Sequence, residues 1–565
     1  MNPSQLWLFC LSLFFSSLSF ATPEPRKDFQ WDTIKLVAIQ DRGRIKPLET
    51  FANETVQYVT GKPHWKGLNS VEVVFGWLIA FDKEWEEEPF IRIDHGPLKK
   101  ALGLETSRKF FSPKELEQNA ELPKIVRDAM QKEQRKERQS ELEKKANQLQ
   151  NQRGLVDFVM SGRAWSLLPN PKGVTQDWFS LAELGEKSKP IPYEPQAGEK
   201  LTTAIRELLT SFMDRNASGW NSATIAFSQS LRDVSEGAYP PVATLQQESH
   251  YNNLHPFRWA WIFYTVAFVA LLTFNVMGAV WGKYAGLGAI LIGIGYHTYG
   301  FVLRCLIAGR PPVTNMYESV IWVTWGCVLF ALVIWWAYQN AIILTASTVF
   351  SIVGLVLADN VPLALDPSIQ PLEPVLRSNY WLTIHVLTIT LSYAAFALSL
   401  CLGNVVLGNY LFRPKEVTTI QNFSLYMYRA MQIGVVLLAA GTILGGVWAD
   451  YSWGRFWGWD PKEVWALIAL LLYLAVLHGR FTGWLRGFGF AATTVVSFLG
   501  VLMAWYGVNF VLGVGLHSYG FGSGGMGYVG LYIALQVGFI ILAYVRYSKV
   551  RASRESEPQI FPRGV

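Results

Sequence analysis

The second half of this chain is a nearly continuous series of apolar segments, each close to the length that crosses a bilayer as a helix. Roughly 20 helical residues span the hydrocarbon core of a membrane. With 51% hydrophobic and only 16% charged residues over 565 positions, the composition excludes a large soluble enzyme. The sequence predicts an all-α polytopic membrane domain at residues 255–548 with about nine transmembrane helices, near 259–280, 284–306, 318–338, 341–361, 381–412, 430–450, 464–484, 488–510 and 527–546.

The preceding residues, 22–254, are charged and mixed in composition, which predicts a separate soluble domain that is mainly helical. We expect a strand and turn at 33–45, helices at 47–59, 122–151 and 201–213, and a loop rich in proline and glycine at 188–199. The highly charged 122–151 helix is interpreted either as a solvated arm or as an arm that docks a partner.

Residues 1–21 contain a short apolar segment that ends in Ser19-Phe20-Ala21, small residues of the kind found at signal-peptide cleavage sites. Because no basic residue precedes the segment, a cleaved signal and a retained anchor both remain open. Both place 22–254 outside the cytoplasm.

The distribution of basic residues predicts the orientation of the spans. Alternating from an external start, the internal segments collect about twice as many lysines and arginines as the external ones, as the positive-inside rule requires. The internal residues are Lys283, Arg413, Lys415, Arg429, Arg480, Arg486, Arg546, Lys549, Arg551 and Arg554, and the external ones are Arg304, Arg310, Arg377, Arg455 and Lys462. The tail at 549–565 is therefore expected in the cytoplasm, and the segment 447–466 outside.

The four cysteines exclude one function. Cys10, Cys305, Cys327 and Cys401 lie in or beside apolar segments, form no C-x-x-C pair, and leave 22–254 without a thiol. Because a thiol–disulfide exchange enzyme needs an accessible reactive thiol, this chain is not expected to act as a reductant.

Residues 447–466, VWADYSWGRFWGWDPKEVWA, hold five tryptophans beside an Asp-Pro-Lys-Glu run. Tryptophans commonly form belts at the membrane interface. Their crowding into one expected loop favours instead an aromatic platform for a flat ligand.

Four histidines fall in the membrane domain, where an ionisable side chain is costly and suggests function. His385 lies about one turn inside the external end of its span, and His517 lies in an external loop, so the two flank the tryptophan segment. His297, near mid-span, and His478, near an internal end, form a possible second pair. Two imidazoles approaching from opposite sides suit the axial positions of haem iron, whereas a hydrogen-bonded structural role is the alternative for each.

The pattern W-x4-W-G-x2-W-x-W-D-P-K-E, from Trp448 to Glu463, resembles the tryptophan-rich "WWD" motif of haem-handling proteins. The order of the neighbouring motifs resembles the System II cytochrome c synthase family of the CcsA/ResC type. These motifs are GRPPVTNMYES at 309–319, YWLTIHV and SYAAF within 380–396, LHGR at 477–480 and GLHSYGF at 515–521. The resemblance covers about 285–525, and GRIKPLETFA at 43–52 is similar to external domains of extended members.

The resemblance implies non-covalent haem b, with His385 and His517, and separately His297 and His478, as iron ligands. It also implies that Trp448, Trp453, Trp457 and Trp459 contact the ring, and that His385, His517 and Asp460 are the catalytic residues. Two roles are open for Arg455 and Lys462: contacts to the haem propionates, or ion pairs with Asp460 and Glu463 that merely fix the loop.

The implied activity is thioether attachment of haem to the C-x-x-C-H segment of apocytochrome c at the outer face of a bacterial inner membrane. The implied partners are apocytochrome c, a CcsB/ResB-like membrane subunit, thiol-reducing proteins and the lipid bilayer, with no nucleic acid. The subunit is expected because 22–254 stands where fused family members carry a multi-span region. The alternatives are a haem exporter or chaperone that serves a separate ligase, and a transporter of another solute.

Overall fold

The computed structural model describes residues 24–79, 84–135, 137, 139–173, 176–184, 191–234, 237–361, 365–372, 378–513, 515, 517 and 525–556. Contacts between residues divide the chain into two compact units, with the boundary between Asn253 and Leu254. The expected signal or anchor at 1–21 and the last residues of the expected tail lie outside the described residues.

The described part of the N-terminal unit is mainly helical and carries three two-stranded antiparallel sheets, which pair β1 with β2, β3 with β4, and β5 with β6. Its strands are β1 (Ala38–Asp41), β2 (Arg44–Pro47), β3 (His64–Trp65), β4 (Leu68–Asn69), β5 (Ile91–Arg92) and β6 (Phe110–Phe111). Its helices are α2 (Asp32–Lys35), α3 (Leu48–Thr60), α4 (Ser70–Ile79), α5 (Glu84–Glu87), α6 (Gly96–Ala101), α7 (Pro113–Glu117), α8 (Glu121–Gln134), α9 (Glu141–Met160), α10 (Leu181–Leu184), α11 (Pro195–Met213), α12 (Ala217–Asp233) and α13 (Val242–Leu254).

Three predicted elements of this unit differ from the structure. The strand expected to begin at residue 33 begins at Ala38, after the short helix α2. The single helix expected at 122–151 is two helices, α8 and α9, because Ser140 starts a new helix through a reciprocal capping box with Glu143. An ion pair of 2.6 Å between Lys132 Nζ and Glu143 Oε1 then joins the end of α8 to the start of α9. Helix α11 begins at Pro195, inside the predicted loop, because proline is well suited to the first helical turn.

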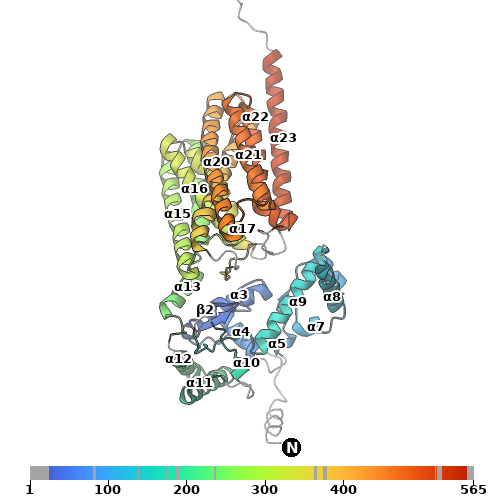
Figure 1. Cartoon of the computed structure of the whole chain (residues 1–565), viewed down its shortest axis with the longest axis vertical. Coiled ribbons are helices and arrows are strands. Elements are labelled where there is room, and N and C mark those ends of the chain that lie inside the picture. The colour runs from blue at the N-terminus through green and yellow to red at the C-terminus, as the bar shows by residue number, and fades with distance from the viewer. Residues whose placement is uncertain are drawn as a thin grey trace, which may run out of the picture. The chain divides into compact units, whose positions relative to one another are not determined.

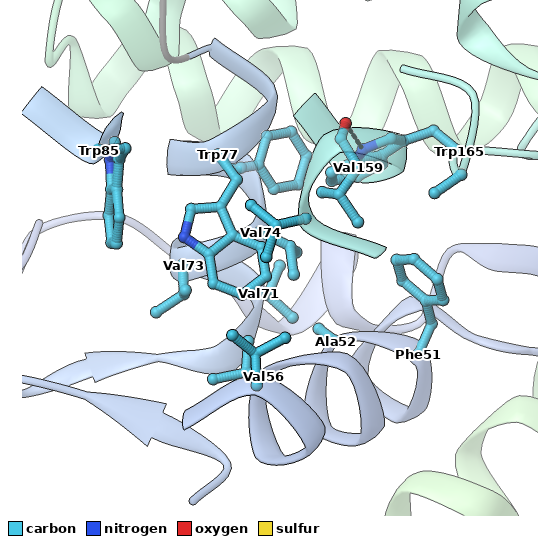
Figure 2. Packing of buried hydrophobic residues seen from close by; sticks show 14 of the residues in the cluster. Phe51, Ala52, Val56, Val71, Val73, Val74, Trp77, Trp85, Val159 and Trp165 are labelled. Atoms are coloured by element: carbon cyan, nitrogen blue, oxygen red, sulfur yellow. Dashed lines mark hydrogen bonds between the residues drawn. The ribbon is translucent and has the colours of Figure 1, made fainter. Parts of the chain in front are cut away.

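Buried aromatic residues form the core of the N-terminal unit. Phe75 of α4 packs edge-on against Trp165 and Trp220, with ring centroids 5.0 and 5.3 Å apart. Figure 2 shows side chains of α3 and α4 packing together, with Trp165 beside them. Large buried aromatic surfaces dominate core energetics. This unit therefore has a hydrophobic core of its own.

The described part of the second unit contains nine helical spans long and apolar enough to cross a membrane, which confirms the all-α polytopic prediction (Figure 1). They are α14 (Pro256–Met277), α15 (Val280–Ala308), α16 (Met316–Tyr338), α17 (Ala341–Asn360), a span of α18 (Asn379–Trp381), η2 (Leu382–Val386) and α19 (Leu387–Phe412), then α20 (Val417–Trp453), α21 (Pro461–Phe481), a span of α22 (Gly487–Leu502) and η3 (Met503–Leu512), and α23 (Met526–Ser556). Helix α20 is longer than predicted, since it starts at Val417 rather than near residue 430.

Glycines on one face of α15 allow it to pack closely against α14. A Cβ added at Gly286 would lie 2.5 Å from Leu271 Cγ, and one at Gly282 would collide with the carbonyl oxygen of Ala270. Small residues at helix interfaces in membranes let two backbones approach closely. This pair of helices therefore depends on the absence of side chains at these positions.

We expect Gly286→Leu to lower the thermal unfolding temperature of the detergent-solubilised protein, because overpacking a close interface typically costs about 1–3 kcal/mol. The matched control is Gly288→Leu on the same helix, where an added Cβ meets nothing within 4 Å. Both substitutions change helix propensity equally. Equal unfolding temperatures for the two variants would show that α14 and α15 do not pack in this way.

Candidate functional site

A cavity opens at the end of the bundle where α16 and α21 begin and where α20 and η3 end. The empty volume of this cavity, including the part that is open to solvent, is about 1370 Å³. Six of the predicted site residues line it: His385, His517, Trp448, Trp453, Trp457 and Lys462. The structure thus brings two histidines that are far apart in the sequence to one cavity.

His385 lies on η2, a π-helical turn in which hydrogen bonds reach one residue further than in an α-helix. Its Nδ1 is 2.8 Å from the carbonyl oxygen of Gly441 on α20. A carbonyl oxygen only accepts hydrogen bonds, so Nδ1 carries a proton, and in the neutral ring the lone pair is then on Nε2. The ring leaves no room for a side chain at Gly445 and meets Trp448 edge-on, with centroids 5.8 Å apart.

His517 is held by the first turn of α21. Its Nδ1 is 2.8 Å from Asp460 Oδ2, and Lys462 Nζ donates to its carbonyl oxygen over 3.3 Å. Gly515, with φ +104°, packs so closely that an added Cβ would lie 2.6 Å from Asp460 Oδ1. Burial lowers the pKa of His517, and the hydrogen bond to Asp460 only partly opposes this shift. The imidazole is therefore neutral at pH 7, with its proton on Nδ1.

The two cavity histidines share one arrangement. Each donates its Nδ1–H to an acceptor that the protein holds in place. Each ring also contacts the face or edge of a tryptophan on α20, and the centroids of His517 and Trp453 are 5.4 Å apart. Neither Nε2 has a hydrogen-bond partner among the described residues. A neutral imidazole whose other nitrogen is bound to a carbonyl or carboxylate is the usual form of a metal-ligating histidine. This donor set fits the axial positions of a haem iron.

The tryptophan segment is not one loop, as the sequence suggested. Helix α20 continues to Trp453 and ends at Gly454, with φ +67°, and α21 begins after Asp460, which caps it in a capping box with Glu463. Trp448 and Trp453 therefore lie on α20, and only the short connection between the helices is loop. Trp457 of this loop lines the cavity, whereas Trp459 does not and is 72% exposed.

The charged residues of this segment mainly fix the loop. Arg455 Nη1 is 3.5 Å from Glu463 Oε1, and its guanidinium lies over the Trp453 ring. Glu463 Oε2 also accepts from the backbone N–H groups of Gly458 and Asp460. Lys462 is the cation of this group that lines the cavity.

The structure does not bring His297 and His478 together. His297 is fully buried on α15, where Nε2 contacts the carbonyl oxygen of Ile321 at 3.0 Å and Nδ1 contacts the Tyr264 hydroxyl at 3.2 Å. Both of its ring nitrogens are thus engaged. It lies about three turns from the end of α15 that is nearest the cavity.

His478 lies at the opposite end of the bundle, within about one turn of the end of α21, and is exposed. Its Nδ1 is bound to the Leu474 carbonyl oxygen at 2.7 Å. Figure 1 shows α15 and α21 in different parts of the bundle. The two histidines therefore differ in both depth and surroundings.

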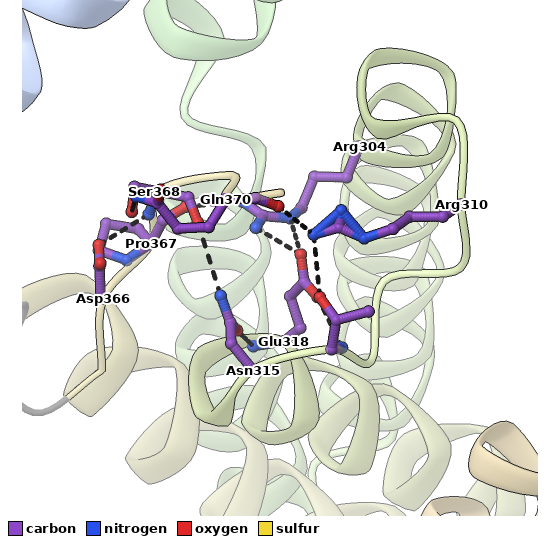
Figure 3. A network of polar contacts seen from close by, with 9 residues as sticks. Arg304, Arg310, Asn315, Glu318, Asp366, Pro367, Ser368 and Gln370 are labelled. Atoms are coloured by element: carbon purple, nitrogen blue, oxygen red, sulfur yellow. Dashed lines mark hydrogen bonds and ion pairs between the residues drawn. The ribbon is translucent and has the colours of Figure 1, made fainter. Parts of the chain in front are cut away.

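A buried ion pair that sequence reasoning did not single out supports one cavity wall. Arg304 Nη2 lies 2.6 Å from Glu318 Oε1, and both side chains are 1% exposed. Glu318 Oε2 accepts from the backbone N–H and the hydroxyl of Thr314, which lines the cavity. Figure 3 shows Arg304 reaching this carboxylate, while Arg310 reaches the carbonyl oxygen of Gln370 in the 366–370 segment. A glutamate at the start of an apolar span was the available signal.

The chain matches the family described as Cytochrome C assembly protein over residues 313–517, a range that includes both cavity histidines. It is 30% identical over 520 residues to Protein NrfI of Wolinella succinogenes, covering 86% of this chain and 54% of that protein. It thus spans about half the length of that relative. It is also 36% identical over 257 residues to Cytochrome c biogenesis protein CcsA of Prochlorococcus marinus strain NATL1A, covering 40% of this chain and 81% of that protein.

A solved structure, Cytochrome c Heme Lyase CcmF, aligns at 13% identity and a TM-score of 0.36, covering 52% of this chain and 50% of that chain. That likeness is too low to carry an inference. The match to CcsA rests on sequence, and it covers most of the relative. By this match the chain belongs to the CcsA-type family of cytochrome c assembly proteins.

Proposed function

We propose that this protein binds haem b non-covalently between His385 and His517 and supports its covalent attachment to apocytochrome c. The observation that carries the proposal is the pair of neutral imidazoles in one cavity, each with Nδ1 bound and Nε2 without a described partner. Haem is the substrate, and it supplies the two vinyl groups. Each cysteine of the reduced C-x-x-C-H segment adds its sulfur to one vinyl carbon and its hydrogen to the other, which gives a thioether without net oxidation.

The chain's own residues act chiefly by holding the substrate in place, which can supply several kcal/mol of barrier lowering. Trp448, Trp453 and Trp457 offer aromatic walls, and Lys462 offers a cation for a propionate. Arg455 is assigned to fixing the loop, because it pairs with Glu463. Trp459 is exposed and does not line the cavity, so we assign it no contact with the ring.

The proposal also requires partners. The described cysteines Cys305, Cys327 and Cys401 lie within membrane spans, so separate thiol-reducing proteins must keep the substrate thiols reduced. We retain His478 as an iron ligand of a second haem site whose other ligand comes from a CcsB/ResB-like membrane subunit, since both nitrogens of His297 are engaged. We place residues 22–254 and the cavity outside the cytoplasm of a bacterium and the 549–565 tail inside.

The spectrum of the purified protein tests the ligand assignment. We expect low-spin, six-coordinate haem that pyridine extraction identifies as haem b. Co-expression with apocytochrome c and a reductant should yield haem that stays on the cytochrome in a denaturing gel. Bound haem without thioether formation would favour an exporter or chaperone, and a protein that purifies without a haem band would refute the proposal.

A further inference from the structure

The two cavity histidines differ in the group that accepts their Nδ1–H. His385 donates to the neutral backbone carbonyl of Gly441, whereas His517 donates to the carboxylate of Asp460, in each case over 2.8 Å. We infer that Asp460 is a positioning residue that makes His517 the stronger electron donor of the pair and lowers the reduction potential of the bound haem. The inference rests on the proposed function.

A carboxylate partner raises the basicity of a ligating imidazole more than a carbonyl does, because it draws the Nδ1 proton toward itself. The added electron density and negative charge stabilise ferric over ferrous iron, and hydrogen bonding around axial ligands is a recognised control of haem potential. Asp460 is only 6% exposed, so solvent screens its charge poorly. The asymmetry of the acceptors should therefore appear as a measurable shift in potential.

Contacts within the protein hold Asp460 in place. It is the N-cap of α21 and accepts from the backbone N–H of Lys462 over 3.1 Å, while Gly515 packs directly against it. Other charges face the same region: the Lys462 ammonium, which donates to the His517 carbonyl, and the paired Glu463 and Arg455. A substitution at 460 leaves these three side chains in the sequence, so it removes one carboxylate from the group.

The decisive variant is Asp460→Asn in the haem-loaded, full-length protein. Asparagine is as good an N-cap as aspartate and still offers an oxygen to His517, so it removes the charge while it keeps the helix start and the hydrogen bond. We expect the low-spin spectrum to persist. The ferric form should lose stability relative to the ferrous form at least tenfold, which raises the reduction potential by about 59 mV for one electron. Asp460→Ala, which loses both cap and acceptor, should also weaken the low-spin spectrum.

The matched control is Asp450→Asn, the same change at an exposed position on α20. Its potential should equal that of the unmodified protein. Equal potentials for the unmodified protein and Asp460→Asn, or an equal shift in Asp450→Asn, would overturn the inference and leave the bis-histidine assignment intact. A loaded protein without low-spin haem would instead overturn the proposed function itself.

Discussion

Replacing either His385 or His517 with alanine is expected to abolish the low-spin haem spectrum and thioether formation. Each substitution removes one of the two proposed axial donors, and no other described histidine lines the cavity. Loss of only an outer partner of a metal ligand typically costs 10–100-fold, so loss of the ligand itself should exceed about 100-fold. The measurements are the absorption spectrum of the purified variant and the yield of covalently labelled cytochrome.

Added imidazole should partly restore both properties, because it can occupy the space that the missing side chain leaves beside Asp460 or Gly441. The control is His64→Ala, at an exposed position of the N-terminal unit. Its spectrum and activity should match those of the unmodified protein. Full activity in either cavity variant, without imidazole, would contradict the ligand assignment.

Glu318→Ala is expected to destabilise the membrane unit by about 3–5 kcal/mol, because it leaves the buried Arg304 guanidinium without its carboxylate. It also removes the acceptor that holds Thr314 at the cavity. The unfolding temperature in detergent and the fraction of monodisperse protein measure the first effect. The retention of haem during purification measures the second.

Two variants make this experiment specific. Glu416→Ala breaks an exposed ion pair with Arg413, whose side chains are 62% and 44% exposed, so it should cost about 0–1 kcal/mol. Replacing both members of the buried pair with apolar residues, Arg304→Met with Glu318→Leu, should recover much of the stability. It should not recover haem retention, because Thr314 still lacks its acceptor. An equal loss of stability in Glu318→Ala and Glu416→Ala would show that the buried pair does not support the fold.

The membrane fold was predictable because a run of apolar residues near bilayer length is a strong local signal, and all nine spans were expected from it. The residues at which the helices begin and end were less predictable. The boundaries at Gly454 and Asp460 lie within the segment expected as one loop, yet the glycine and the Asp-Pro-Lys-Glu capping pattern were the available signals.

The cavity pair was predictable because His385 and His517 both fall near the same membrane face when residues are counted along the spans. The hydrogen-bonding partners of His297 were not predictable, since Tyr264 and Ile321 belong to two other helices. Counting along one helix gives depth but not neighbours. The sequence likewise gave no means to see that Arg304 and Glu318 meet, because their contact depends on how α15 and α16 pack.

The two hydrogen-bond acceptors of the cavity histidines also differ in whether a mutation can remove them. Every amino acid brings a backbone carbonyl, so no codon change at position 441 deletes the group that receives the His385 proton, although a bulkier residue there would press on Ile389. The acceptor for His517 is a side chain, and a single nucleotide change can delete or neutralise it. Natural variation can therefore change the acceptor on the His517 side of the site. The acceptor on the His385 side is part of the backbone and persists in every variant.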